Sequence, residues 1–102
     1  MMTEPTAMKA QIEQTVRRLV SEWATEPPDL SRVTLETDLE RDLDVDDLTA
    51  IEIVLALEEA FEVDIDDEEF FESDGGCVRL RPAVRTPGGI ALFIAQKLGL
   101  AT

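Results

Sequence analysis

The chain of 102 residues contains no histidine and a single cysteine, Cys77. Histidine is the commonest general base and the commonest metal ligand, so its absence excludes a hydrolase triad built on histidine. One cysteine can form neither an internal disulfide nor a cysteine-rich zinc site. The many carboxylates are not paired with a nucleophile in the sequence, and solvated acids are the default interpretation. We therefore predict a protein that is not an enzyme.

Positive charge and long apolar runs are also scarce. Nine Lys and Arg residues stand against 23 Asp and Glu residues, and the net charge is −14. This charge repels phosphate backbones and anionic membrane surfaces, so it excludes nucleic acid as a good partner and favours basic proteins. No apolar run approaches the ~20 residues of a membrane span. Residues 1–8 include Glu4 and Pro5 and lack the apolar stretch of a signal peptide, so we expect a cytoplasmic protein.

The charge is distributed unevenly along the chain. Between residues 26 and 74 there are 20 acidic residues and only two basic ones, Arg32 and Arg41. After residue 74 no acid occurs, and this tail carries four cations: Arg79, Arg81, Arg85 and Lys97. We expect this basic tail to fold back and neutralise part of the acidic middle, in preference to forming a separate basic binding site.

Hydrophobic periodicity predicts a single domain over residues 1–102, with a flexible segment at 1–7 and helices over about 8–23, 47–62, 66–71 and 86–98. The stretch 30–45 reads as a long loop with a few apolar anchors. Gly75 and Gly76 mark a turn, followed by a short extended piece that Pro82 ends. The fold class is therefore a small all-α, four-helix bundle. We expect its core to include the larger apolar side chains, namely Met8, Trp23, Phe61, Phe70, Phe71 and Phe93.

The predicted second helix has two apolar stripes. Asp47 is expected to be its N-cap, since a carboxylate accepts hydrogen bonds from the N–H groups of the first turn. The first stripe, predicted to face the core, comprises Ala50, Val54, Leu57 and Phe61. The second stripe, with acids beside it, comprises Leu48, Ile51 and Leu55, flanked by Glu52, Glu58 and Glu59. The second stripe is either a wider buried face or a partner surface, and the sequence leaves both open.

Residues 39–71, LERDLDVDDLTAIEIVLALEEAFEVDIDDEEFF, resemble the acyl carrier protein family. The family pattern is an Asp-Leu-Gly-x-Asp-Ser-Leu segment opening an acidic helix, then Glu-Glu-x-Phe and an extended Ile. The residues in register with this pattern are Asp42, Leu43, Asp46, Leu48, Glu52, Glu58, Glu59, Phe61 and Ile65. The resemblance implies a monomeric helical carrier whose second helix binds a basic patch on a synthase, ligase or transferase. The implied partner-binding residues are Asp46, Leu48, Ile51, Glu52, Leu55, Glu58 and Glu59.

The sequence departs from this family pattern at three places. Asp44 stands where the family has Gly, which is a minor change because Asp tolerates unusual backbone angles. Asp47 stands where the family has the Ser that carries 4′-phosphopantetheine, and a carboxylate has no hydroxyl to attack coenzyme A. About ten extra residues, within 73–85, precede the last helix. We therefore expect no phosphopantetheine cofactor on this chain.

Three interpretations of Asp47 remain open. It is only a helix cap, or it imitates the negative phosphodiester of a loaded carrier, or the parent sequence has Ser at this position. The first predicted function is accordingly a carrier-like domain that docks on acyl- or peptidyl-transfer enzymes without cargo. The alternatives are a working carrier in fatty-acid, polyketide or lipid synthesis, with another attachment hydroxyl or a parental Ser, and an acidic inhibitor of a basic protein outside lipid metabolism.

A calcium loop is the one metal site that the sequence suggests. Asp42, Asp44 and Asp46 form an Asp-x-Asp-x-Asp run, as in an EF-hand. An EF-hand then requires Gly at the sixth position and Glu at the twelfth, and here those positions hold Asp47 and Ile53. We predict no dedicated metal site.

Overall fold

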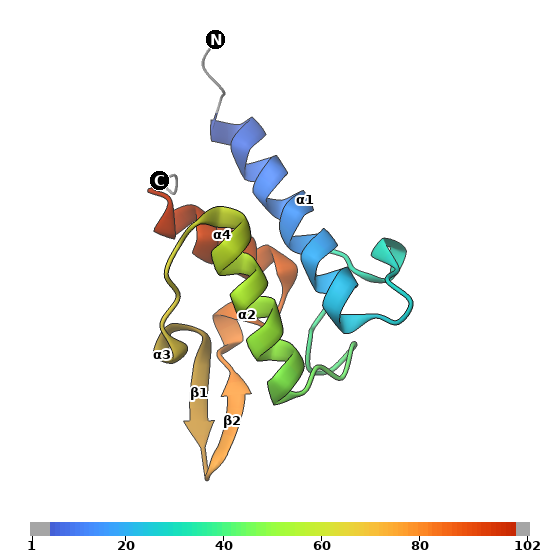
Figure 1. Cartoon of the computed structure of the whole chain (residues 1–102), viewed down its shortest axis with the longest axis vertical. Helices are drawn as coiled ribbons and strands as arrows, with labels where there is room; N and C mark the ends of the chain where they lie inside the picture. Colours follow the sequence, from blue (N-terminus) through green and yellow to red (C-terminus); the bar gives the residue numbers. More distant parts are fainter. Residues whose placement is uncertain (1–4, 100–102) are drawn as a thin grey trace.

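The computed structural model describes residues 5–99, apart from the side chains of residues 5–7, 74 and 77. Residues 1–4 of the segment predicted to be flexible lie outside the described residues, whereas residues 5–7 form the first turn of a helix, so the prediction was wrong for them. The thiol of Cys77 also lies outside the described part. Figure 1 shows the elements, which in chain order are α1 (Pro5–Ala24), η1 (Leu30–Arg32), α2 (Asp47–Phe61), α3 (Asp67–Phe70), β1 (Phe71–Asp74), β2 (Cys77–Leu80), η2 (Pro82–Val84) and α4 (Pro87–Lys97). The four predicted helices are confirmed, and a small two-stranded sheet is added to them.

The core lies where α1 packs against α2 and α4. The apolar stripe predicted for α1 supplies its side of this core, because Val16 and Val20 are completely buried. On α2 the buried residues recur three or four positions apart, as a helix with one core face requires. The core residues of the three long helices are Ile12, Val16, Leu19, Val20, Ala50, Ile53, Val54, Leu57, Ile90, Ala91, Ile94 and Ala95.

Trp23 does not belong to this core, and the prediction that it would was wrong. Its side chain is 45% exposed. The buried side chains at this end of α1 are instead Ser21, in the last turn, and Thr25, directly after the helix. The Thr25 hydroxyl donates to the Ser21 carbonyl at 2.6 Å and accepts from the backbone N–H of Asp29 at 2.7 Å. These bonds fold the loop over the polar side of the helix and leave the indole outside.

The long loop between α1 and α2 is anchored by buried side chains and backbone bonds. Val33 and Leu39 are completely buried. The Leu39 N–H donates to the carbonyl of Arg85 at 2.7 Å, and the carbonyl of Leu35 accepts from the Gly88 N–H at 2.9 Å. Because both partners lie at or just before the start of α4, the loop is held against the beginning of that helix. The chain consequently enters α2 from a fixed position.

Strands β1 and β2 form an antiparallel hairpin that projects at the end of the molecule opposite the start of α1 (Figure 1). Gly75 and Gly76 make its two-residue turn, and both have positive φ angles, 60° and 88°. Such turns need positive φ at both central positions, which glycine adopts without steric cost. The sequence predicts the turn and the second extended piece. It does not predict the first strand, because the third predicted helix, 66–71, includes Phe71, the first residue of β1.

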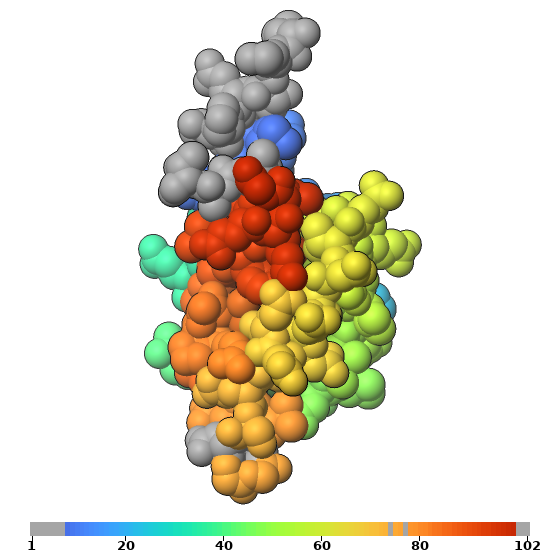
Figure 2. Space-filling view, turned by 90° about the vertical axis from the view of Figure 1, so that its left-hand side faces the viewer, coloured from blue at the N-terminus to red at the C-terminus, as the bar shows by residue number. Residues whose placement is uncertain are grey.

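The basic tail pairs with the acidic middle, and that prediction is confirmed. Glu40, in the long loop, pairs with Arg85 at 3.3 Å and with Arg79 at 3.6 Å. Lys97 of α4 pairs with Glu69 of α3 at 2.7 Å. Figure 2 shows the resulting arrangement of this face, with α4 (red) above, α3 (yellow-brown) at the centre, α2 (green) at the right-hand edge and the hairpin (orange) at the lower end.

Two possible features are not seen in the part of the chain that the structure describes. None of its helices is long and apolar enough to cross a membrane. Within the same residues, no group of three or more His, Cys, Asp or Glu side chains is arranged to hold a metal ion.

Candidate functional site

Helix α2 begins with two neighbouring aspartates that have different roles. Asp46, and not Asp47 as predicted, is the N-cap: its backbone is extended, and its carboxylate accepts the Thr49 N–H at 2.8 Å. This bond is the largest cause that holds the pKa of the Asp46 carboxyl below its ordinary value of 3.8. Asp47 is the first helical residue, and it is exposed.

The turn before α2 decides which aspartate caps the helix. Asp44 has a left-handed backbone with φ of 54°, as expected for a residue at the family's Gly position. The Val45 N–H donates to the Leu39 carbonyl at 2.9 Å and closes the turn. Since Leu39 is buried, this turn fixes the backbone of Asp46 relative to the core. The next residue, Asp47, is thereby placed at an exposed corner.

The second apolar stripe of α2 faces outward. Leu48 is 67% exposed, Leu55 is 58% exposed and Ile51 is 48% exposed. We call these three side chains the α2 ridge. The interpretation as a wider buried face, which the sequence left open, is therefore wrong. A ridge of three large aliphatic side chains is typical of a binding surface and not of scattered surface residues.

The acids beside the ridge differ in what they contact. Glu59 is exposed and Glu52 is half-buried. Within the described residues, no ion pair involves either of them. Glu58 instead accepts the backbone N–H of Ile65 at 2.9 Å, so its carboxylate ties the segment after α2 to the helix. Among the predicted partner-binding acids, Asp46 and Glu58 thus also have structural bonds.

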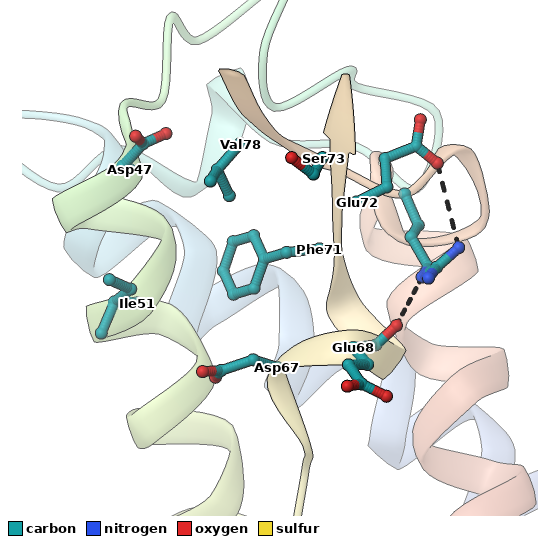
Figure 3. A pocket seen from close by; sticks show the side chains of 9 residues that line it. Asp47, Ile51, Asp67, Glu68, Phe71, Glu72, Ser73 and Val78 are labelled. Atoms are coloured by element: carbon teal, nitrogen blue, oxygen red, sulfur yellow. Dashed lines mark hydrogen bonds and ion pairs between the residues drawn. The ribbon is translucent and has the colours of Figure 1, made fainter. Parts of the chain in front are cut away.

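A groove of about 670 Å³ lies between α2 and the hairpin. In Figure 3 the ring of Phe71 points from β1 toward the α2 side, between Ile51 and the hairpin, with Val78 beside it. The register pairs Phe71 with Leu80 and Ser73 with Val78, so one face of the hairpin is directed toward the groove. The full lining is Asp47, Ile51, Asp67, Glu68, Phe71, Glu72, Ser73, Val78 and Arg81.

Sequence reasoning missed the hairpin wall of this groove. Two extended runs separated by Gly75-Gly76 are a hairpin signal, and the second run alternates Val78 and Leu80 with arginines. Pairing the two runs would have placed Phe71 opposite Leu80 and Ser73 opposite Val78, on one face of a hairpin. Of the predicted site residues, Asp47 and Ile51 line the groove, whereas the others lie on or beside the α2 ridge.

The helical core, the ordered loop and the exposed face of α2 define a small helical domain with an acidic second helix. Residues 14–75 match the family described as "Phosphopantetheine attachment site", and the chain belongs to that family. The resemblance to acyl carrier proteins is thereby confirmed. The chain is accordingly of the carrier type and is not a catalyst.

Acyl carrier proteins from several organisms are similar to this chain. The one from Desulforapulum autotrophicum is 34% identical over 58 residues, which are 57% of this chain and 74% of the relative. The one from Phaeodactylum tricornutum is 48% identical over 40 residues, or 39% of this chain and 53% of the relative. The one from Helicobacter acinonychis is 44% identical over 41 residues, or 40% and 53%. The chain thus spans about half the length of the last two.

The expectation that phosphopantetheine has no part here was wrong, because the matching family is that of its attachment site. The groove wall formed by Ile51, Phe71 and Val78 borders position 47 and is apolar, which suits the uncharged part of the pantetheine arm. The side chain of Asp47 is a carboxylate, which has no hydroxyl with which to form a phosphodiester.

Proposed function

We propose that the chain is an acyl carrier-type domain that docks on acyl- or peptidyl-transfer enzymes through the exposed face of α2. The observation that carries this proposal is the α2 ridge. Leu48, Ile51 and Leu55 are about half or more exposed, while the opposite face of the same helix fills the core. A helix that keeps three large aliphatic side chains in water has a surface suited to a partner.

The charge around the α2 ridge supports a basic partner. Asp47 and Glu59 are exposed near its two ends, and Glu52 lies alongside it. Attraction between this acidic rim and a basic patch accelerates encounter, and the apolar contact then holds the complex. We expect weak and fast association that weakens as salt rises, because exposed charges are screened within about 10 Å at 0.1 M salt.

We further propose that Asp47 occupies the attachment position of the family. Its register with the family pattern and its exposed place at the first turn of α2 support this assignment. In a carrier, the attachment residue has to be accessible to the enzyme that transfers phosphopantetheine. The exposed corner formed by the turn at Asp44 provides that access.

Enzymatic loading tests both proposals. The chain and its Asp47→Ser variant are each incubated with coenzyme A and a broad-specificity phosphopantetheinyl transferase, and their intact masses are measured. We expect the Asp47→Ser variant to gain one phosphopantetheine, since it combines a hydroxyl with an unchanged docking face. A gain in the unaltered chain would locate the group on another hydroxyl, which peptide mapping identifies.

Matched variants distinguish docking from simple access to a hydroxyl. In the Asp47→Ser background, Leu55→Ala removes an exposed side chain of the ridge, and Leu92→Ala removes a comparably exposed one on α4. We expect slower loading for the first and unchanged loading for the second. Absence of loading in a folded Asp47→Ser variant would overturn the assignment of position 47.

The net charge of −14 favours a second candidate, an acidic protein that binds a basic partner outside lipid metabolism. The two candidates differ in the part that the α2 ridge takes. Binding to a basic protein that ignores Leu48 and Leu55 substitutions, together with no loading of the Asp47→Ser variant, would favour the second candidate. Loading that depends on Leu55 would favour the first.

A further inference from the structure

The hairpin gives the molecule a second apolar surface next to the α2 ridge. Val78 of β2 is 50% exposed, and with Ile51 and half-buried Phe71 it lines the groove of about 670 Å³ (Figure 3). Ile51 belongs both to this groove and to the α2 ridge. Through Ile51, the apolar surface of α2 therefore adjoins the groove beside the hairpin.

The rim of the groove is predominantly negative. Its charged residues are Asp47, Asp67, Glu68, Glu72 and Arg81. The Arg81 guanidinium donates to the backbone carbonyl of Glu68 at 2.6 Å and lies 3.9 Å from the Glu72 carboxylate. Its positive charge is therefore already paired with groups of α3 and β1. The carboxylates of Asp47, Asp67 and Glu68 remain on the rim, so anions are disfavoured in the groove and cations are favoured.

We propose that this groove binds a segment of the partner enzyme in which one large aliphatic side chain is flanked by Lys or Arg. The proposal rests on the proposed function and deepens it by naming the partner's chemistry. In the chain without pantetheine, where no arm occupies this wall, the aliphatic side chain contacts Ile51, Phe71 and Val78, and the flanking cations pair with Asp47 and Glu68. The hairpin thus acts as a second wall that selects among partners which the α2 ridge alone would accept.

Charge decides between this occupant and the competing ones. A second copy of the chain carries the same net charge of −14, so its approach to an acidic rim is unfavourable. An anionic small molecule meets the same carboxylates. A basic segment instead gains from both the apolar wall and the rim. Charge complementarity and continuity with the α2 ridge together favour the basic partner segment.

The test uses the full chain and a defined probe, a fluorescein-labelled nonapeptide with a central Leu between Lys and Arg residues. Fluorescence anisotropy measures its affinity, and amide shifts locate its contacts. We expect shifts at Ile51 and Val78, weakening by about tenfold for Val78→Lys and by about threefold for Glu68→Gln. Two control peptides, with the Leu replaced by Ala or the cations by Glu, are expected to bind more weakly.

Two control variants carry comparable substitutions away from the groove. Leu92→Lys changes a comparably exposed side chain on α4, and Glu36→Gln removes one exposed charge in the long loop. We expect both to retain affinity within about twofold, because surface changes far from a contact have small effects. Equal weakening by Leu92→Lys and Val78→Lys would overturn the proposal, as would amide shifts confined to the ridge. Thermal melts of each variant identify those that fail to fold.

Two further outcomes separate this proposal from the proposed function. If Leu55→Ala slows loading of the Asp47→Ser variant while the peptide does not bind the groove, the docking function stands and the groove proposal fails. If sedimentation shows dimers that Val78→Lys dissociates, the occupant is a second copy, and this also overturns the proposal. If neither loading nor peptide binding occurs in folded protein, both proposals fail.

Discussion

The two faces of helix α2 carry similar aliphatic side chains, but one face is buried and the other is exposed to solvent. Ile53 and Leu57 are completely buried, whereas Leu48 and Leu55 are 67% and 58% exposed. All four are aliphatic and lie within one helix of 15 residues. The difference arises from packing, because α1 covers one face of α2 and no described element covers the ridge. Substitutions on the two faces should therefore separate folding stability from partner binding.

The largest effect is expected on the buried face. Leu57→Ala removes a completely buried side chain from the contact of α2 with the core and leaves a cavity. Such changes typically lower the free energy of unfolding by about 2–5 kcal/mol. Urea denaturation monitored by circular dichroism measures the loss. Leu55→Ala is the matched control on the exposed face, and its free energy of unfolding should change by less than about 0.5 kcal/mol. Equal losses for the two variants would break the comparison.

The next largest loss of stability is expected for Glu40→Ala, because Glu40 holds the hairpin beside the exposed face of α2. Its carboxylate accepts the Leu80 N–H at 3.1 Å and pairs with Arg85. Leu80 is buried, so Glu40→Ala leaves its N–H without this acceptor, at a cost of about 1–3 kcal/mol. Amide exchange at Leu80 should accelerate, and urea denaturation should show the loss. Glu36→Ala, in the same loop, is the control. Unchanged exchange at Leu80 would show that the hairpin is held mainly by its apolar contacts.

Changes to the α2 ridge should affect association and not folding. In the Asp47→Ser background, Leu48→Ala and Leu55→Ala together should lower kcat/KM for phosphopantetheine loading by about tenfold or more, as expected for central apolar contacts of an interface. Initial rates followed by mass spectrometry give this value. The melting temperature should stay close to that of the parent variant. A fall in loading that matched a fall in stability would mean that the ridge is part of the folded core after all.

The comparison also shows how far sequence reasoning extends. The starts of α3 and α4 follow from local chemistry: Asp66 forms a capping box with Glu69, and Thr86 caps a helix that opens with Pro87. The choice between Asp46 and Asp47 does not, because both residues cap helices equally well. The turn closed by the hydrogen bond from the Val45 N–H to the carbonyl of buried Leu39 determines that Asp46 is the cap.

The solvent exposure of the α2 ridge could not be predicted either. Periodicity identifies apolar stripes on a helix, but it does not show which stripe another element covers. Trp23 is a second example, since it lies on an apolar stripe of α1 but remains 45% exposed. The groove depends on the pairing of two short runs, 71–74 and 77–80, that are distant from α2 in sequence. Exposure and strand pairing both depend on tertiary structure. The sequence therefore predicts the α2 residues of the candidate site but not the hairpin wall of the groove.

The smallest expected effect concerns the cap that presents the exposed face. The pKa of Asp46 lies below its ordinary value of 3.8, chiefly because its carboxylate accepts the Thr49 N–H. A group whose pKa is lowered on folding stabilises the folded state above its unfolded pKa, and this contribution is lost as the pH falls through the folded pKa. Asp46→Asn keeps a capping side chain but removes the titration. Melting temperatures from neutral pH down to below about pH 3 should therefore fall less steeply for this variant.

The comparison of the two proteins isolates the cap from the other carboxylates. Asp29, Asp42 and Glu69 also have lowered pKa values, so both proteins lose stability in acid. Only the difference between their melting temperatures reports on the cap. Parallel curves would mean that the bond from Thr49 holds no more tightly to a charged acceptor than to a neutral one.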